Sequence, residues 1–160
     1  MFELSQSLDI DRPAAQVWPY LVAFEQVPLW EHGVVEVRQV TPGPPDIGTE
    51  IFARRIYGGR ESDVTGRIVA FEEGRSATMS LRGGPLGEAY VEYVVEPIDD
   101  RRSVVTFRAR GNLIRPLRFL HPILPALGRA ETRKNLAKLK RRIEAGIQPT
   151  SPSTTPAHDR

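Results

Sequence analysis

Residues 124–145 read LPALGRAETRKNLAKLKRRIEA, and this stretch predicts the longest helix of the chain. At ~100° per residue, one face of that helix collects apolar and small polar residues, and basic residues occupy the rest of the wheel. Pro125 suits a first helical turn, and Gly146 and Pro149 are typical of a helix end. Most of the remaining chain has the pattern of strands, so we expect much of the sheet to pack against this helix. The face comprises Leu124, Gly128, Thr132, Asn135, Leu136, Leu139 and Ile143.

The two halves of this face differ in polarity. Its later half is aliphatic and predicts ordinary core. Its earlier half places Gly128, Thr132 and Asn135 where a dry core would hold leucine. A buried polar group without a partner costs about 1–3 kcal/mol, so we expect the earlier half to face a partly polar cavity. The alternative is polar capping of the rim of the sheet.

The composition is that of one globular domain. The chain has 160 residues, enough to bury a real core, and its lack of cysteine excludes disulfides and thiolate metal sites. The three histidines are scattered without metal-binding spacing, so we expect neither a metal nor another cofactor. The first residues do not resemble a secretory signal, and no run approaches the ~20 apolar residues of a membrane span. We therefore expect a cytoplasmic protein.

The charge distribution is uneven although the net charge is small. The formal net charge is +2 and the pI about 9.2, and much of the basic excess lies on the last helix. Such a face can bind nucleic acid or a membrane surface. Aromatic residues do not interleave with these charges, so we expect a solvated helix face and no nucleic-acid partner. Peripheral membrane contact is the less favoured alternative.

Alternating apolar residues predict seven strands joined mostly by short turns. Consecutive strands with short turns favour an antiparallel sheet. A helix is expected at 13–24, after Asp11 as a cap, and a single helical turn at 25–30. The expected strands are 2–10, 34–41, 49–57, 60–71, 76–81, 88–96 and 103–111.

Two segments fall outside this pattern. Residues 113–125 are apolar but interrupted by three prolines, which predicts short helical turns over an opening. Residues 147–160 are rich in proline, serine and threonine, which predicts a disordered tail after a domain that spans 1–146.

Several short motifs follow one another along the chain: IDRPAAQVW at 10–18, PLW at 28–30, IGT at 47–49, VEP at 95–97 and LAKLK at 136–140. In this order and spacing they resemble the polyketide cyclase/dehydrase-like branch of the START-like (SRPBCC) superfamily. The resemblance covers about 145 residues, everything except the tail. It departs from the common pattern at Pro19 and in the proline-interrupted segment.

The resemblance implies an α+β helix-grip fold. In this fold a seven-stranded curved antiparallel sheet wraps around a long C-terminal helix, two short helices follow the first strand, and an apolar cavity lies between sheet and helix. Members bind lipids, sterols, polyketides or other hydrophobic small molecules, and some are cyclases, aromatases or dehydratases. We therefore expect a monomer or homodimer that binds a lipid, an isoprenoid or a polyketide-like molecule without catalysis.

Two alternatives remain open. One is a cofactor-independent cyclase, aromatase or dehydratase that polarises a carbonyl with arginine and tyrosine. The other is a protein-interaction role for the basic helix and residues 113–125. Two or more polar side chains converging deep in the cavity would favour the enzyme, whereas a uniformly apolar cavity would favour a carrier.

The alternation of apolar and polar residues along the strands predicts which side chains line the cavity. Tyr93 shares parity with Val91 and Val95, so we expect it to face inward. Arg54 and Arg55 point to opposite faces, and the sequence does not say which one faces the cavity. The expected ligand-binding residues are Trp30, Phe52, Arg54, Tyr57, Tyr93, Phe107, Leu124, Leu127, Gly128, Glu131, Thr132 and Asn135, and the sequence identifies no catalytic residue.

Overall fold

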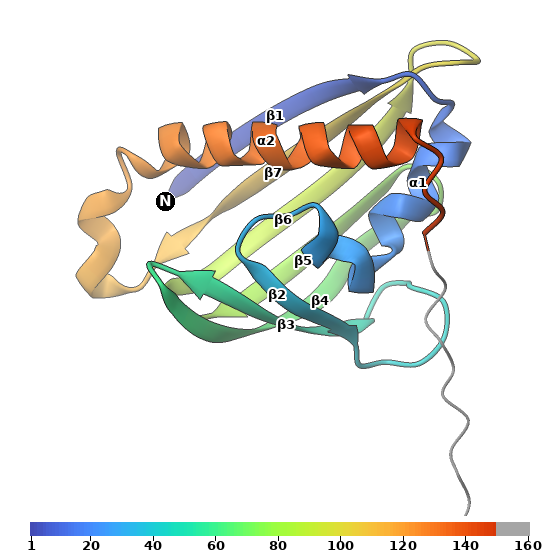
Figure 1. Ribbon diagram of the computed structural model, residues 1–160. Coiled ribbons are helices and arrows are strands. Elements are labelled where there is room, and N and C mark those ends of the chain that lie inside the picture. Colours follow the sequence, from blue (N-terminus) through green and yellow to red (C-terminus); the bar gives the residue numbers. More distant parts are fainter. Residues whose placement is uncertain (150–160) are drawn as a thin grey trace, which may run out of the picture.

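The computed structural model describes residues 1–149. One seven-stranded antiparallel sheet, in the order β1-β7-β6-β5-β4-β3-β2, is covered on one face by helices (Figure 1). This arrangement confirms the predicted helix-grip fold. The strands are β1 (Phe2–Ile10), β2 (Val34–Gln39), β3 (Glu50–Tyr57), β4 (Arg60–Glu72), β5 (Ser76–Gly83), β6 (Leu86–Pro97) and β7 (Ser103–Leu113).

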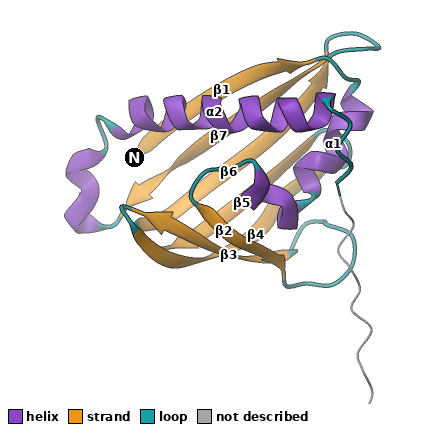
Figure 2. Cartoon of the chain, in the orientation of Figure 1, coloured by secondary structure: helices purple, strands orange, loops and turns teal. Residues whose placement is uncertain are grey.

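The helices follow the first and last strands. They are α1 (Ala14–Val22), η1 (Phe24–Leu29), η2 (Arg115–Leu120) and α2 (Leu124–Glu144), where η marks a 3-10 helix. Figure 2 shows α2 running along β1 and β7, α1 at one end of the sheet and η2 beyond its other end. The expected short helical turns in 113–125 are therefore present. None of the helices in residues 1–149 is both long and apolar enough to cross a bilayer.

The strand boundaries agree with the sequence pattern except around 82–87, which was expected to be a loop. Here β5 and β6 extend to a tight turn at Gly84-Pro85. Gly83 has a φ of 131°, and a Cβ atom there would lie 2.3 Å from the Asp63 carbonyl oxygen. Glycine at position 83 thus permits β5 to approach β4 closely. Composition alone had suggested that residues 82–87 form a loop.

The core lies between the later half of α2, α1 and the middle of the sheet. Leu136, Leu139 and Ile143 are almost fully buried, as are Val95 and Val105 of the sheet. The aliphatic half of the helix face is therefore core, as predicted.

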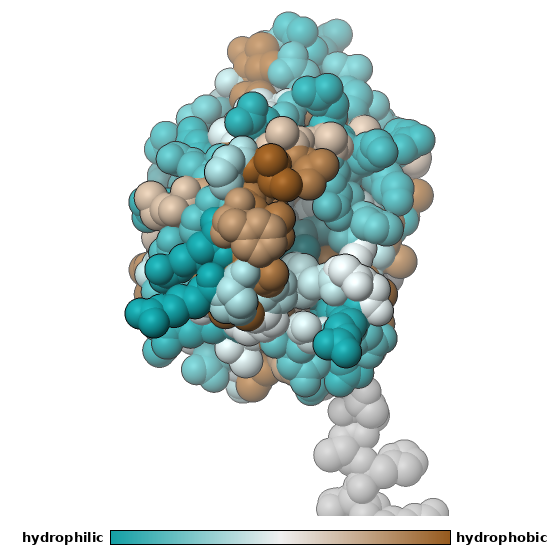
Figure 3. All heavy atoms as spheres, turned by 90° about the vertical axis from the view of Figure 1, so that its left-hand side faces the viewer, coloured by the Kyte–Doolittle hydropathy of each residue, from teal (hydrophilic) through white to brown (hydrophobic). Residues whose placement is uncertain are grey.

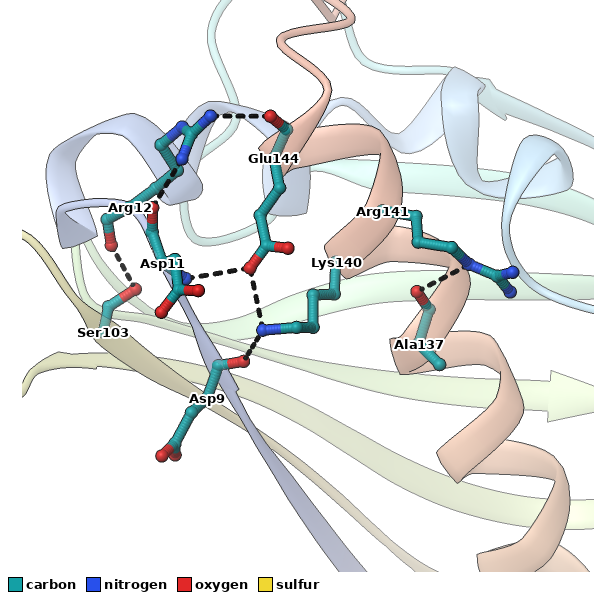
Figure 4. A network of polar contacts seen from close by, with 8 residues as sticks. All are labelled: Asp9, Asp11, Arg12, Ser103, Ala137, Lys140, Arg141 and Glu144. Carbon is teal, nitrogen blue, oxygen red and sulfur yellow. Dashed lines mark hydrogen bonds and ion pairs between the residues drawn. The ribbon is translucent and has the colours of Figure 1, made fainter.

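The C-terminal end of α2 is held by a polar network (Figure 4). Lys140 donates to the Asp9 carbonyl at 2.8 Å and pairs with Glu144 at 2.7 Å. Glu144 also accepts the Asp11 N–H at 3.0 Å, and Arg12 donates to the Glu144 carbonyl at 2.6 Å. Gly146, at φ 71°, closes the helix. This end of α2 is thereby fixed to the junction of β1 and α1.

The predicted tail lies almost wholly outside the described residues, since 150–160 are not among them. Residues 147–149 follow α2 without regular secondary structure.

Candidate functional site

A cavity of about 260 Å³ lies between the earlier half of α2 and the sheet. Most of its wall is apolar and comes from alternate residues of β3, β5, β6 and β7, because the inward parity of each strand is apolar. Gly128 brings α2 close to β1, since a Cβ atom there would lie 2.7 Å from Leu4 Cδ2. Gly128, Glu131, Thr132 and Asn135 form the helical side of the cavity.

Polar side chains from β3, β6 and the segment after η1 also border this mostly apolar cavity. Arg55 Nη2 of β3 donates to Glu31 Oε1 at 2.7 Å, and these side chains are only 24% and 12% exposed. The Tyr93 side chain of β6 lies near the same carboxylate, and Tyr57 lies beside the guanidinium, 6.0 Å from ring centroid to Cζ. We call Glu31, Arg55, Tyr57 and Tyr93 the polar cluster.

Burial fixes the protonation states of the cluster. Burial raises the pKa of Tyr93 well above its ordinary value, and the negative charge of Glu31 adds to the rise. Burial also raises the pKa of Tyr57, although the positive charge of Arg55 opposes this. For Arg55, burial is the largest single influence and would lower the pKa, but Glu31, Tyr57 and Tyr93 together outweigh it and the pKa is raised. Both phenols therefore stay protonated, and Arg55 stays charged, across the physiological range.

Asn135 connects the cavity wall to the segment that carries Glu31. Its Oδ1 accepts the backbone N–H of His32 at 3.1 Å. The partner that a buried amide requires is thus supplied from outside α2, while the side chain still borders the cavity.

The cavity opens into a larger groove of about 740 Å³ at the end of the molecule that carries η2. The groove and the cavity share His32, Ile56, Tyr57, Leu86 and Glu131, so the two spaces adjoin each other. Figure 3 shows this end, where hydrophobic residues gather beside a hollow. We call this groove the mouth. Its outer wall consists of Leu113, Leu117, Leu120 and Leu124.

A sequence model of the family described as "polyketide cyclase / dehydrase and lipid transport" matches residues 1–144. The chain belongs to this family. No curated protein sequence matches it. The family assignment agrees with the resemblance seen in the sequence motifs.

Solved structures of low sequence identity share the fold of this family member. A START superfamily protein from Mycobacterium smegmatis has a TM-score of 0.77 at 15% identity, covering 91% of this chain and 99% of that one. The Zhui aromatase/cyclase from Streptomyces sp. R1128 has a TM-score of 0.73 at 13% identity, covering 91% and 95%. The two-domain aromatase/cyclase BexL has a TM-score of 0.70 at 19% identity, covering 90% of this chain and 47% of that protein. At these identities the likeness concerns the fold alone.

Most of the residues expected to bind ligand do border this space. Leu124 borders the mouth, whereas the others border the inner cavity: Tyr57, Tyr93, Phe107, Gly128, Glu131, Thr132 and Asn135. That they contact a ligand stays a prediction.

Four expected residues lie elsewhere. Phe52 and Arg54 are on the outer face of the sheet, where Phe52 packs against the Arg38 guanidinium and Arg54 pairs with Asp63 at 3.2 Å. Leu127 is 65% exposed on the side of α2 turned away from the sheet. Trp30 is buried behind the cavity wall, edge-on to Tyr93 at 6.1 Å between ring centroids.

The sequence analysis did not name Glu31, and it left open whether Arg54 or Arg55 faces the cavity; the structure places Arg55 there. The parity of β3 contained the signal for Arg55, because Ile51 and Ala53 share its face whereas Glu50 and Arg54 share the other. Glu31 gave no local signal, since its partner is 24 residues away in sequence. Within residues 1–149, no group of three or more His, Cys, Asp or Glu side chains could hold a metal ion.

Proposed function

We propose that the protein binds a hydrophobic small molecule, such as a lipid, an isoprenoid or a polyketide-like compound, in the space between the sheet and α2. The inner cavity is smaller than the ~300–1,000 Å³ usual for ligand pockets. A ligand of ordinary size therefore extends from the cavity into the mouth.

The observation that carries this proposal is a mostly apolar cavity whose wall includes a small group of polar side chains. Apolar surface supplies the affinity for a hydrophobic body, at about 25 cal/mol per Å². Arg55 is held as a donor by Glu31, and the protonated Tyr93 hydroxyl near it is a second donor that a ligand oxygen can use. The preferred ligand is therefore hydrophobic along most of its length and bears a carbonyl or hydroxyl oxygen at its inner end.

Filling the cavity tests this proposal. Thr132→Trp places a large ring in the cavity, while Ala130→Trp places the same ring on the exposed side of α2. Binding is measured with a fluorescent apolar probe and by displacement of the probe with fatty acids, isoprenols and aromatic ketones. We expect at least tenfold weaker binding for Thr132→Trp and little change for Ala130→Trp. Equal binding by both variants would contradict a ligand in this cavity.

The second candidate function is cofactor-independent cyclase or dehydratase chemistry in the same cavity. It is favoured by the convergence of Glu31, Arg55 and Tyr93, which the sequence had not revealed. Arg55 and Tyr93 can stabilise the oxygen of a carbonyl as it becomes an enolate, because both are donors in a site of low water content. Glu31 fixes the position of Arg55 through their ion pair.

Tyr93→Phe separates the two candidates. The change removes the hydroxyl and keeps the ring that packs on Trp30 and Phe107. If the protein is an enzyme, incubation with a poly-β-ketone thioester mimic should show turnover. Tyr93→Phe should then lower that turnover at least tenfold without changing the affinity for the mimic. If the unaltered protein binds the mimic tightly but does not turn it over, the result would support binding and exclude this catalysis.

A further inference from the structure

The segment that forms the outer wall of the mouth is apolar on both of its sides. Its inner side consists of leucines that border the mouth. On its outer side, Phe119, Ile123 and Leu127 are 73%, 54% and 65% exposed. We call these three residues the mouth patch. Single exposed apolar residues are common, but three at one edge beside a ligand opening indicate a contact surface.

Most charges next to the mouth patch are positive, although Glu131 also borders the mouth. Arg115, Arg118 and Arg129 lie next to it in the chain and are exposed, and the sequence has no acidic residue between Asp100 and Glu131. Within residues 1–149, none of these three arginines has an ion-pair partner, whereas other arginines of the protein, such as Arg55 and Arg108, do. The arginines are therefore available to an anionic partner.

We propose that the mouth patch and these arginines dock the protein on an anionic lipid bilayer, with the mouth turned toward the membrane. Apolar side chains flanked by cations are the combination that binds the interface of an anionic membrane. The orientation places the opening of an apolar cavity against an apolar phase, so a hydrophobic ligand moves between the two without crossing water.

The same charges disfavour a second copy of this chain as the occupant. A twofold interface sets the same patch on both subunits, so Arg115, Arg118 and Arg129 would meet their own copies, and one carboxylate, Glu131, would be set against three cations. An anionic surface has the complementary charge.

Vesicle sedimentation tests the proposal with phosphatidylcholine vesicles that contain or lack phosphatidylglycerol. We expect binding only to the anionic vesicles, weakened by added salt. Each arginine near such a surface strengthens binding roughly fivefold. Arg118→Gln with Arg129→Gln should therefore weaken binding roughly 25-fold. The matched control, Arg67→Gln with Arg101→Gln, removes exposed arginines away from the mouth and should change binding less than about twofold.

The apolar contribution is tested with a second pair of variants. Phe119→Ser with Ile123→Ser should abolish sedimentation with anionic vesicles, whereas Val40→Ser with Ile98→Ser, at similarly exposed positions elsewhere, should leave it unchanged. All four residues are exposed, and an unchanged melting temperature verifies that the variants fold.

Three results would overturn the proposal. The first is a lack of binding to anionic vesicles, and the second is an equal loss of vesicle binding in the patch and control variants. The third is a dimer in solution that Phe119→Ser dissociates, which would assign the patch to a second copy. Docking is independent of cavity binding, so Thr132→Trp should still sediment with vesicles. A failure of ligand binding is thus distinguished from a failure of docking.

Discussion

At the scale of single residues, removing one partner of the Glu31–Arg55 pair leaves the other charge without its counter-ion in a mostly buried site. Breaking a buried pair costs about 3–5 kcal/mol. Partial exposure reduces this, so we expect Arg55→Met to lower the free energy of unfolding by about 2–4 kcal/mol. Urea denaturation measures the change. The double variant Arg55→Met with Glu31→Met should be more stable than Arg55→Met alone, and equal stability of the two would contradict coupling.

Asn135 has two roles at once, and one substitution affects both. Asn135→Leu removes the acceptor for the His32 N–H and adds apolar volume at the cavity wall. We expect a loss of about 1 kcal/mol in the free energy of unfolding, typical of one hydrogen bond, and a changed order of preference among the displacing ligands. Thermal melting and the displacement assay measure the two effects. An unchanged ligand order would exclude Asn135 from the ligand contact.

Residue-level prediction succeeded where one face of an element has a single character. Tyr93 and Phe107 share parity with aliphatic neighbours, and their inward orientation followed from alternation. It failed for Phe52, because an aromatic ring was taken to be inward although its own face carries Glu50 and Arg54. On that face the ring is covered by arginines instead of by core. The Glu31–Arg55 contact depends on chain topology, which alternation does not encode.

At the scale of elements, α2 is divided into a core half and a cavity half. Leu139 is 1% exposed in the core half. Leu139→Ala should lower the free energy of unfolding by about 2–5 kcal/mol, because it removes buried methyl groups and leaves a void. Chemical denaturation measures this. A change below ~0.5 kcal/mol would be inconsistent with packing of this face on the sheet.

The network at the end of α2 predicts a dependence of stability on pH. The hydrogen bond from Lys140 is the main cause that holds the pKa of Glu144 below its ordinary value near 4.5, and the Asp11 N–H adds to it. A lowered folded pKa gives stability that is present above about pH 4.5 and is lost as the pH falls through the folded value. Melting temperatures between pH 7 and pH 3 should fall less steeply for Glu144→Gln than for the unaltered protein.

The control for this dependence is Glu61→Gln, which changes an exposed carboxylate of β4 away from α2. Its melting temperature should follow that of the unaltered protein at every pH. If Glu144→Gln follows it too, the network does not contribute to acid sensitivity.

Most elements were predictable because their periodicity is strong. The predicted last helix, 124–145, differs by one residue from α2, and the predicted first strand coincides with β1. The turn at Gly84-Pro85 was not predictable, because a glycine- and proline-rich segment has the composition of a loop whether or not flanking strands continue into it.

At the scale of the whole molecule, a ligand between the sheet and α2 contacts elements from both ends of the chain. A ligand that binds only the folded state adds about 2.7 kcal/mol at a concentration of 100 times its Kd. We expect a displacing ligand to raise the melting temperature by several degrees, a size typical of a domain this large. Thr132→Trp should not show this rise. A rise equal to that of the unaltered protein would place the ligand elsewhere.

The pairing of β1 with β7 has a consequence for the order in which the chain folds. Phe2 of β1 lies opposite Gly111 of β7, and the Asp11 N–H donates to the Glu144 carboxylate of α2. The strand that is synthesised first therefore pairs with elements that are synthesised last. During synthesis the nascent β1 has neither a ladder partner nor a helix to cover its apolar face. Closing such long loops is slow, and topologies dominated by distant pairing fold in about milliseconds to seconds. The domain therefore completes folding only after α2 has left the ribosome, and until then the apolar face of β1 is uncovered.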